Sequence, residues 1–247
     1  MKLKKIEPRF KDKNNPRVGL ITLATDFNIE KDFNEIIDHK KIDLYCNRIH
    51  SYNPLTNENL KKMAKDITDV AADILPNQKL DCVAYGCTSG TIAAGYKSIH
   101  DKVNIAKPNT KVTTPITSTM NALNVLKIKK LSIFTPYTNE INRSVINFFN
   151  KEGIEISEFA FFDIASDLDI GKVNPDYLFE ILCKLDVSKN DALFVSCTAL
   201  PVLTMIKDLE KKLGKIVLSS NQTLIWDTLK QIDYKNNIKD FGELFNN

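Results

Sequence analysis

The feature that most constrains this sequence is an internal repeat of about 110 residues. Three pairs of segments match in the same order along the 247-residue chain. The matched pairs are Val18–Asp26 with Leu131–Asn139 (offset 113), Asp81–Thr88 with Asp191–Thr198 (offset 110), and Lys111–Thr117 with Lys215–Asn221 (offset 104). Each match is weak alone, but three in the same order with similar offsets predict two similar halves.

Strand-like apolar runs alternate with helix-like stretches through both halves. The predicted strands are residues 17–23, 42–49, 80–85, 131–135, 154–161, 192–196 and 216–219. One helix is predicted between Thr56, a candidate N-cap, and Pro76. This alternation is typical of βαβ units around parallel sheets. We therefore expect an α/β protein with two pseudo-symmetric parallel-sheet halves, Rossmann-like or flavodoxin-like, and an active site in the crevice between them.

The repeat also suggests how the chain is divided. Residues 1–16 are expected to form an N-terminal arm, followed by a first half over residues 17–115. The second half is expected to span residues 116–219. A C-terminal helix, at about residues 220–247, is expected to cross back to the first half.

Composition excludes several classes of protein. The chain has 34 basic and 31 acidic residues, so its net charge of +3 gives no electrostatic reason to expect a nucleic acid or an anionic membrane as partner. Polar residues and Pro201 interrupt the longest apolar run, so no membrane-spanning helix is predicted. Five cysteines without a CxxC pair fit a reducing, cytoplasmic location better than a disulfide scaffold.

Cys87 and Cys197 occupy equivalent positions in the two halves, each directly before a threonine. Each is expected to lie at the end of a strand and the start of a helix, on opposite walls of the crevice. A helix N-terminus lowers the pKa of a thiol and also attracts anions. The hydroxyls of Thr88, Ser89 and Thr198 are therefore candidate ligands for a substrate carboxylate. Two opposed thiols suit a two-base proton transfer, in which one removes a proton and the other returns one.

The sequence gives no sign of a metal or an organic cofactor. It contains neither of the common glycine-rich phosphate-binding motifs and no HExxH zinc motif. A zinc site at Cys82 and Cys87 is not expected because their spacing fits no ligand pattern. Cys46, Cys82 and Cys183 are expected to be small buried hydrophobic residues.

The segments Gly86–Thr91 and Ser196–Leu200 resemble the paired cysteine motifs of the aspartate/glutamate racemase superfamily. The resemblance covers nearly the whole chain, from about residue 17 to residue 232. It implies a cofactor-independent enzyme of two similar α/β halves in which Cys87 and Cys197 are both catalytic. Members of the superfamily often form dimers, so the resemblance leaves a homodimer open.

Three segments are similar to one branch of that superfamily, which contains maleate cis–trans isomerase, arylmalonate decarboxylase and the ectoine-utilisation proteins. They are residues 135–142, 196–200 and 219–222. Glutamate racemases have a histidine where this chain has Ala199, so glutamate racemase activity is not expected. The decarboxylase keeps only the second cysteine, so the presence of both argues against simple decarboxylation.

The same resemblance marks Tyr137, Asn142, Thr198 and Ala199 as substrate-binding residues. Asp26 stands where maleate isomerase has an asparagine. Its negative charge favours a substrate with an amino or amidine cation over a dicarboxylate. The alternatives are that Asp26 only caps a helix and that Tyr137 only packs on its own half.

These observations predict a two-cysteine racemase or isomerase that acts on a small carboxylate with a nitrogen substituent, such as an amino acid or an ectoine-derived compound. One alternative is a maleate-type cis–trans isomerase, in which one cysteine adds to a double bond and the other supplies a proton. Another is a non-catalytic binding protein with the same fold. The only small-molecule partner expected is the carboxylate substrate.

Overall fold

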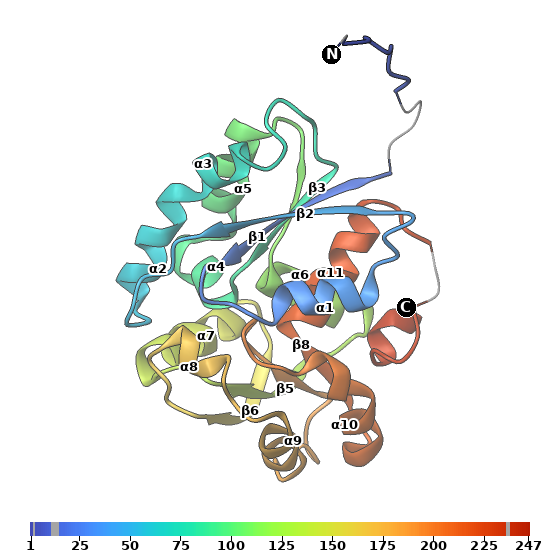
Figure 1. The fold of residues 1–247 in the computed structure, drawn as a ribbon. Coiled ribbons are helices and arrows are strands. Elements are labelled where there is room, and N and C mark those ends of the chain that lie inside the picture. The colour runs from blue at the N-terminus through green and yellow to red at the C-terminus, as the bar shows by residue number, and fades with distance from the viewer. Residues whose placement is uncertain (2, 11–14, 236–237) are drawn as a thin grey trace.

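Two four-stranded parallel sheets form the framework of the protein (Figure 1). The structure, a computed structural model, describes residues 1, 3–10, 15–235 and 238–247. The strand order is β2-β1-β3-β4 in the first sheet and β6-β5-β7-β8 in the second, and all neighbouring strands are parallel. The common order confirms the predicted α/β class with two similar halves.

The bounds of the elements agree with most of the predicted strands. The strands are β1 (Arg17–Leu23), β2 (Asp43–Ile49), β3 (Cys82–Gly86), β4 (Lys111–Thr113), β5 (Lys130–Thr135), β6 (Glu155–Phe161), β7 (Ala192–Val195) and β8 (Ile216–Ser219). The helices are α1 (Ile29–Ile36), α2 (Asn57–Met63), α3 (Ile67–Ala72), α4 (Thr88–Ala94), α5 (Tyr96–Ala106), α6 (Pro115–Val125), α7 (Asn139–Lys151), α8 (Asp167–Ile170), α9 (Pro175–Cys183), α10 (Ile206–Leu213) and α11 (Ser220–Gln231), with short 3₁₀ helices η1 (Ala64–Asp66), η2 (Leu203–Met205) and η3 (Glu243–Asn246). Strand β4 was expected only as a matched segment. The single helix predicted before Pro76 is divided into α2, η1 and α3, although Thr56 does cap its start.

The pairing registers show how closely the halves correspond. The pairs that define them are Val18 with Cys82 and Cys82 with Lys111 in the first sheet, and Leu131 with Ala192 and Ala192 with Ile216 in the second. Val18 is therefore equivalent to Leu131 and Cys82 to Ala192, which reproduces the predicted offsets of 113 and 110. Lys111 is equivalent to Ile216, so the third offset is 105 and not 104. With this change, Thr114 and Ser219 become equivalent, and each caps the helix that follows it.

Helices lie on both faces of the first sheet. Helix α3 packs against β1 and β2, and α11 packs against β3 and β4. Although α11 follows the last strand of the second sheet, it lies beside α6 and α1 in the first half (Figure 1). The chain therefore crosses from the second half back to the first directly after β8, and this crossing brings the start of α11 to the boundary between the halves.

The described residues of the N-terminal arm form no helix or strand, and Leu3, Ile6 and Phe10 in it are exposed. Residues 2 and 11–14 of the predicted arm lie outside the described residues, as do residues 236–237 of the predicted C-terminal segment. In the part of the chain that the structure describes, no helix has the length and apolar character needed to cross a membrane.

Strand β3 runs directly into α4, and the first turn of this helix is packed around the Cys87 sulfur. Cys87 is the N-cap, and its Sγ accepts the N–H of Gly90 at 3.2 Å. A Cβ added at Gly90 would lie 2.7 Å from this sulfur and 3.1 Å from the hydroxyl of Tyr85. Only glycine therefore fits at position 90 without displacing the sulfur.

Gly90→Ala is expected to lower the free energy of unfolding by about 1–3 kcal/mol, because the added methyl group overpacks the turn. Urea unfolding measures this cost. In a Cys87→Ala background the same substitution should cost less, since the sulfur that it meets is gone. An equal cost in both backgrounds would show that the sulfur does not impose glycine here.

Candidate active site

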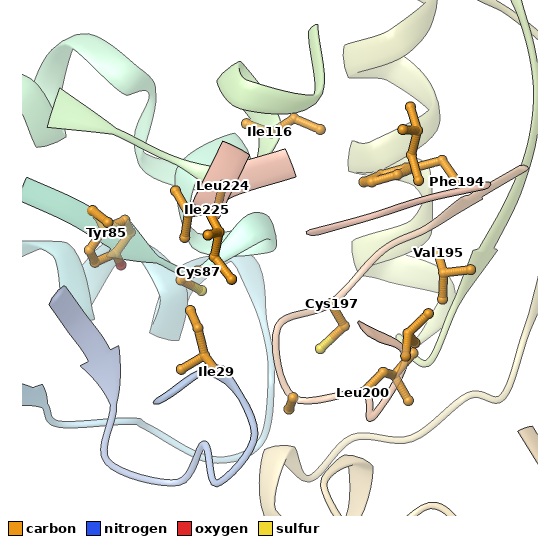
Figure 2. Packing of buried hydrophobic residues seen from close by; sticks show 14 of the residues in the cluster. Ile29, Tyr85, Cys87, Ile116, Phe194, Val195, Cys197, Leu200, Leu224 and Ile225 are labelled. Atoms are coloured by element: carbon orange, nitrogen blue, oxygen red, sulfur yellow. The ribbon is translucent and has the colours of Figure 1, made fainter. Parts of the chain in front are cut away.

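The structure brings the two predicted catalytic cysteines together. Cys87 follows β3 and Cys197 follows the equivalent strand β7, and their sulfur atoms point into the same space between the halves (Figure 2). Both residues are buried, with exposed fractions of 3% and 6%. The site is therefore closed off from bulk solvent.

The backbone around the two cysteines differs. Cys87 begins α4, as predicted, but Cys197 begins no helix. A turn follows Cys197, and the next helical segment is η2. The φ of Cys197, 131°, lies in a region that residues other than glycine rarely adopt. The predicted helix start at Cys197 is therefore wrong, and the loop needs other contacts to hold this conformation.

Hydrogen bonds between the two cysteine loops supply part of that support. The Oγ of Ser220, the first residue of α11, accepts the backbone N–H of Cys197 at 3.0 Å and the hydroxyl of Thr88 at 2.8 Å. The hydroxyl of Thr198 donates to the carbonyl of Gly86 at 3.3 Å. Thr88 and Thr198, both predicted as substrate ligands, thus join the halves in this structure.

Two asparagines fasten the rest of the Cys197 loop. The side-chain amide of Asn28 donates to the carbonyl of Ala199 at 2.5 Å. Asn221 donates to the carbonyl of Thr198 at 2.8 Å and to the carboxylate of Asp32 at 2.7 Å. The loop residue Ala199, another predicted ligand, is held in place through its backbone. Its role toward a substrate stays a prediction.

Tyr137 lies beside both thiols. It is buried, its hydroxyl hydrogen-bonds to Cys197, and burial together with the Cys197 and Cys87 thiols raises its pKa well above the ordinary value. The phenol therefore keeps its proton and can donate it to a sulfur atom. Asn142 supports this loop, because it accepts the hydroxyl of Thr135 at 2.5 Å and donates to the carbonyl of Tyr137 at 2.9 Å.

Ser89 has a more direct position than the two threonines. Its Oγ lies 4.0 Å from the Sγ of Cys87, and the residue is buried. Thr88 and Thr198 form hydrogen bonds that join the halves, whereas the Ser89 hydroxyl lies next to a predicted catalytic sulfur. Its part in substrate binding stays a prediction.

Asp26 lies two residues before Asn28, the N-cap of α1, and one of its carboxylate oxygens holds the start of this helix. Its Oδ1 accepts the N–H groups of Asn28 at 2.8 Å and Ile29 at 3.0 Å. Its Oδ2 is buried and has no hydrogen-bond partner among the described residues. Burial raises the pKa of Asp26, and the N–H groups of Ile29 and Asn28 and the hydroxyl of Thr198 oppose that rise. Capping therefore accounts for only one of the two carboxylate oxygens.

Asp167, the first residue of α8, is a site residue that the sequence analysis missed. It is buried, and it accepts the hydroxyl of Thr25 at 2.5 Å. Burial raises its pKa to about 6, and the negative charge of Asp26 adds to the rise. The sequence did contain a pattern that could have identified Asp167. It lies in the loop after the predicted strand 154–161, and the loops at the carboxyl ends of parallel strands form the ligand site.

Burial dominates the pKa of both thiols. It raises the pKa of Cys87 to about 12 and the pKa of Cys197 well above its ordinary value. The N–H groups of Gly90 and Ala199 act in the opposite direction, whereas the charges of Asp167 and Asp26 add to the rise. The predicted lowering of the pKa by helix N-termini is therefore outweighed, and both groups are protonated thiols in this structure.

The remaining cysteines lie elsewhere. Cys82 is buried as expected, but Cys46 is exposed and Cys183 is only partly buried, so the expectation of burial is wrong for these two. Both are on elements whose outer faces meet solvent, β2 and α9. Over the described ranges, no group of three or more potential metal ligands occurs.

Asp167→Asn is expected to stabilise the protein more at pH 8 than at pH 4. Since the pKa is about 6 when folded and near 3.8 when unfolded, protonation favours the folded state, and stability falls as the pH rises through this window. Removing the charge recovers about 2–3 kcal/mol at pH 8 and little at pH 4. Urea unfolding of both proteins at the two pH values measures the difference. The same difference at both would contradict a raised pKa.

Comparison with known proteins identifies the family. The profile of the family described as arylmalonate decarboxylase matches residues 52–245. A maleate isomerase from Alcaligenes faecalis is 30% identical over 197 residues, covering 76% of this chain and 77% of that protein. One from Geobacillus stearothermophilus is 26% identical over 244 residues, covering 92% and 96%.

Solved structures have the same fold. The maleate isomerase Iso from Pseudomonas putida S16 gives a TM-score of 0.86 at 21% identity, over 94% of this chain and 98% of that chain. A mutant of the Nocardia farcinica maleate cis–trans isomerase with a covalently bound succinylcysteine intermediate gives 0.85 at 17% identity, over the same shares. The chain belongs to the arylmalonate decarboxylase and maleate isomerase family, within the aspartate/glutamate racemase superfamily that its cysteine motifs indicated.

Proposed function

We propose that this protein is a cofactor-independent isomerase that uses Cys87 and Cys197 to convert a small cis-unsaturated carboxylate into its trans isomer. The observation that carries the proposal is the pair of buried thiols on equivalent loops, with their sulfur atoms directed toward the same region between the halves (Figure 2). The relatives named maleate isomerase support it, as does the succinylcysteine in the Nocardia farcinica structure. This is the maleate-type alternative, and it has more support than racemisation.

In the proposed reaction, the thiolate of one cysteine adds to the alkene carbon β to the substrate carboxylate. As the S–C bond forms, the π electron pair moves to the α carbon, which takes the proton of the other thiol. The former double bond is now single and can rotate. The second thiolate then removes the proton, the C–S bond breaks, and the trans alkene leaves. Every atom and electron pair is returned, so the cycle consumes no co-reactant.

The contacts of the two sulfur atoms suit this sequence of charges. One thiol must give its proton to solvent before it adds to the alkene, and the N–H groups of Gly90 and Ala199 and the hydroxyl of Tyr137 can each stabilise the negative sulfur that results. Burial excludes water that would otherwise protonate the carbanion. Because both thiols are buried, the loops over them must move apart to admit a substrate.

A second candidate is two-base racemisation of a carboxylate with a nitrogen substituent. Asp26 favours it, because its buried and unpartnered oxygen can accept a hydrogen bond from an amino group. The same cysteines would act in it, one removing the α proton and the other returning it to the opposite face. An ectoine-derived substrate, like a homodimer, stays a prediction.

Cys87→Ser and Cys197→Ser are each expected to reduce isomerisation by at least about a hundredfold. The probes are maleate and cis-γ-aminocrotonate, two cis-unsaturated carboxylates of similar length. The variant that keeps the adding cysteine should accumulate a covalent adduct, because the group that reprotonates and deprotonates the adduct is impaired. Intact-protein mass spectrometry should show a gain of one substrate, and peptide mapping should place it on the remaining cysteine.

Cys46→Ser, an exposed cysteine outside the site, is the control and should retain full activity. A racemase would form no adduct, and each serine variant would instead exchange the α proton of one enantiomer in deuterated water. Full isomerase activity in both serine variants would overturn the proposal. Ligand binding without turnover in the parent protein would indicate a binding protein instead.

A further inference from the structure

Two carboxylates from opposite halves lie near the reacting thiols, and Thr25 links them. Asp26 follows β1, Asp167 begins α8, and the hydroxyl of Thr25 donates to Asp167. Their exposed fractions are 1% and 3%. The charges of both carboxylates act on Cys87 and on Cys197. A hydrogen bond also places the Asp26 loop beside Cys197, because the side chain of Asn28 donates to the carbonyl of Ala199 at 2.5 Å.

Neither carboxylate forms a salt bridge within the described ranges. Arg48 is the cation whose charge acts on Asp26, but its guanidinium is engaged elsewhere. It donates to the carbonyl of Leu23 at 3.2 Å and to the backbone carbonyl of Asp26 at 2.7 Å, and it pairs with Glu30. Within the described ranges the Oδ2 of Asp26 accepts no hydrogen bond, and the nearby hydroxyl of Thr198, which lowers the pKa of Asp26, donates to the carbonyl of Gly86. A buried carboxylate oxygen in this state lacks the donor that its burial normally requires.

We infer that the non-reacting end of the substrate carries a protonated amine, held between Asp26 and Asp167. The inference rests on the proposed function for the other end, where a carboxylate conjugated to a double bond meets the thiols. An ammonium group has three N–H donors, enough to reach the free oxygen of Asp26 and the carboxylate of Asp167 together. It also stabilises the ionised forms of two buried carboxylates to which the described residues offer no salt bridge.

A dicarboxylate such as maleate suits this arrangement of charges poorly. At pH 8 Asp167, with a pKa of about 6, is ionised, and a cysteine ionised for reaction adds a second negative charge beside the Asp26 carboxyl group. A second substrate carboxylate would add another negative charge to a buried space in which like charges repel strongly. Asp26 and Asp167 are therefore the residues expected to determine which end group the site accepts.

Binding of saturated analogues tests the inference without turnover. γ-Aminobutyrate and succinate have the same chain length and differ in one end group, ammonium against carboxylate. Calorimetric titration at pH 8 should show the parent protein binding γ-aminobutyrate at least about tenfold more tightly, which corresponds to about 1.4 kcal/mol. Asp26→Asn and Asp167→Asn should each reduce or reverse that preference. Both substitutions keep the size of the side chain, and asparagine can still cap α1.

Asp227→Asn is the matched control, because Asp227 is also buried but accepts hydrogen bonds from Ser118 and Asn121 away from the thiols. It should keep the preference of the parent protein. Tighter binding of succinate by the parent, no binding of γ-aminobutyrate, or the same preference in both site variants would overturn the inference.

Turnover separates this inference from the proposed function. Isomerisation of cis-γ-aminocrotonate in preference to maleate supports both. If maleate is isomerised faster, the isomerase function stands and the assignment of Asp26 and Asp167 fails. If γ-aminobutyrate binds as expected but neither alkene is isomerised, the charge assignment stands and the proposed function fails.

Discussion

The hydroxyl of Ser220 connects the two cysteine loops, and the geometry of the site depends on it. It accepts one hydrogen bond from the backbone of Cys197 and another from the side chain of Thr88, next to Cys87. Ser220 can do this only because α11 leaves the second sheet and packs on the first. The crossing of the chain after β8 therefore does more than cover a sheet. It fixes the separation of two thiols that belong to different halves, and it supports the unusual φ of Cys197.

The carboxylates near this connection reduce the stability of the fold at neutral pH. Burial raises the pKa of Asp26 and of Asp167, so the ionised form of each is less stable inside the protein than in water, whereas the two thiols stay protonated and neutral. A core built for stability alone would carry apolar side chains at these positions. Clusters of buried titratable groups with shifted pKa values are typical of functional sites. Such groups lower the stability of the free protein, and a ligand that stabilises their ionised forms binds more tightly as a result. In the part of the chain that the structure describes, neither carboxylate has a paired cation, and a cationic ligand would stabilise both.

Much of the fold could be predicted from the repeat, because strand periodicity and the Cys-Thr pairs are local patterns. Two of the three offsets were right, and the third differed by one residue, where a short strand, β4, left few residues to align. The missing helix after Cys197 could not be predicted, since the loop is held by Ser220, Asn28 and Asn221, which lie far away in the sequence. The prediction that the pKa of both thiols would be lowered was wrong for a related reason. A helix N-terminus is a local feature, whereas burial depends on how the halves close over the site.

The halves are similar in topology, yet the backbone around their two cysteines differs. Each sulfur has a backbone N–H and a tyrosine hydroxyl beside it, from Gly90 and Tyr85 at Cys87 and from Ala199 and Tyr137 at Cys197. Cys87 caps a helix, however, whereas Cys197 stands in a turn with a φ of 131°. A two-base racemase works in both directions through bases that exchange roles, so matched surroundings would serve it best. Addition and elimination across a double bond need one nucleophile and one proton donor, and unequal surroundings separate these tasks. The departure from symmetry at the carboxyl ends of β3 and β7 thus favours cis–trans isomerisation, even though the framework around it is a repeat.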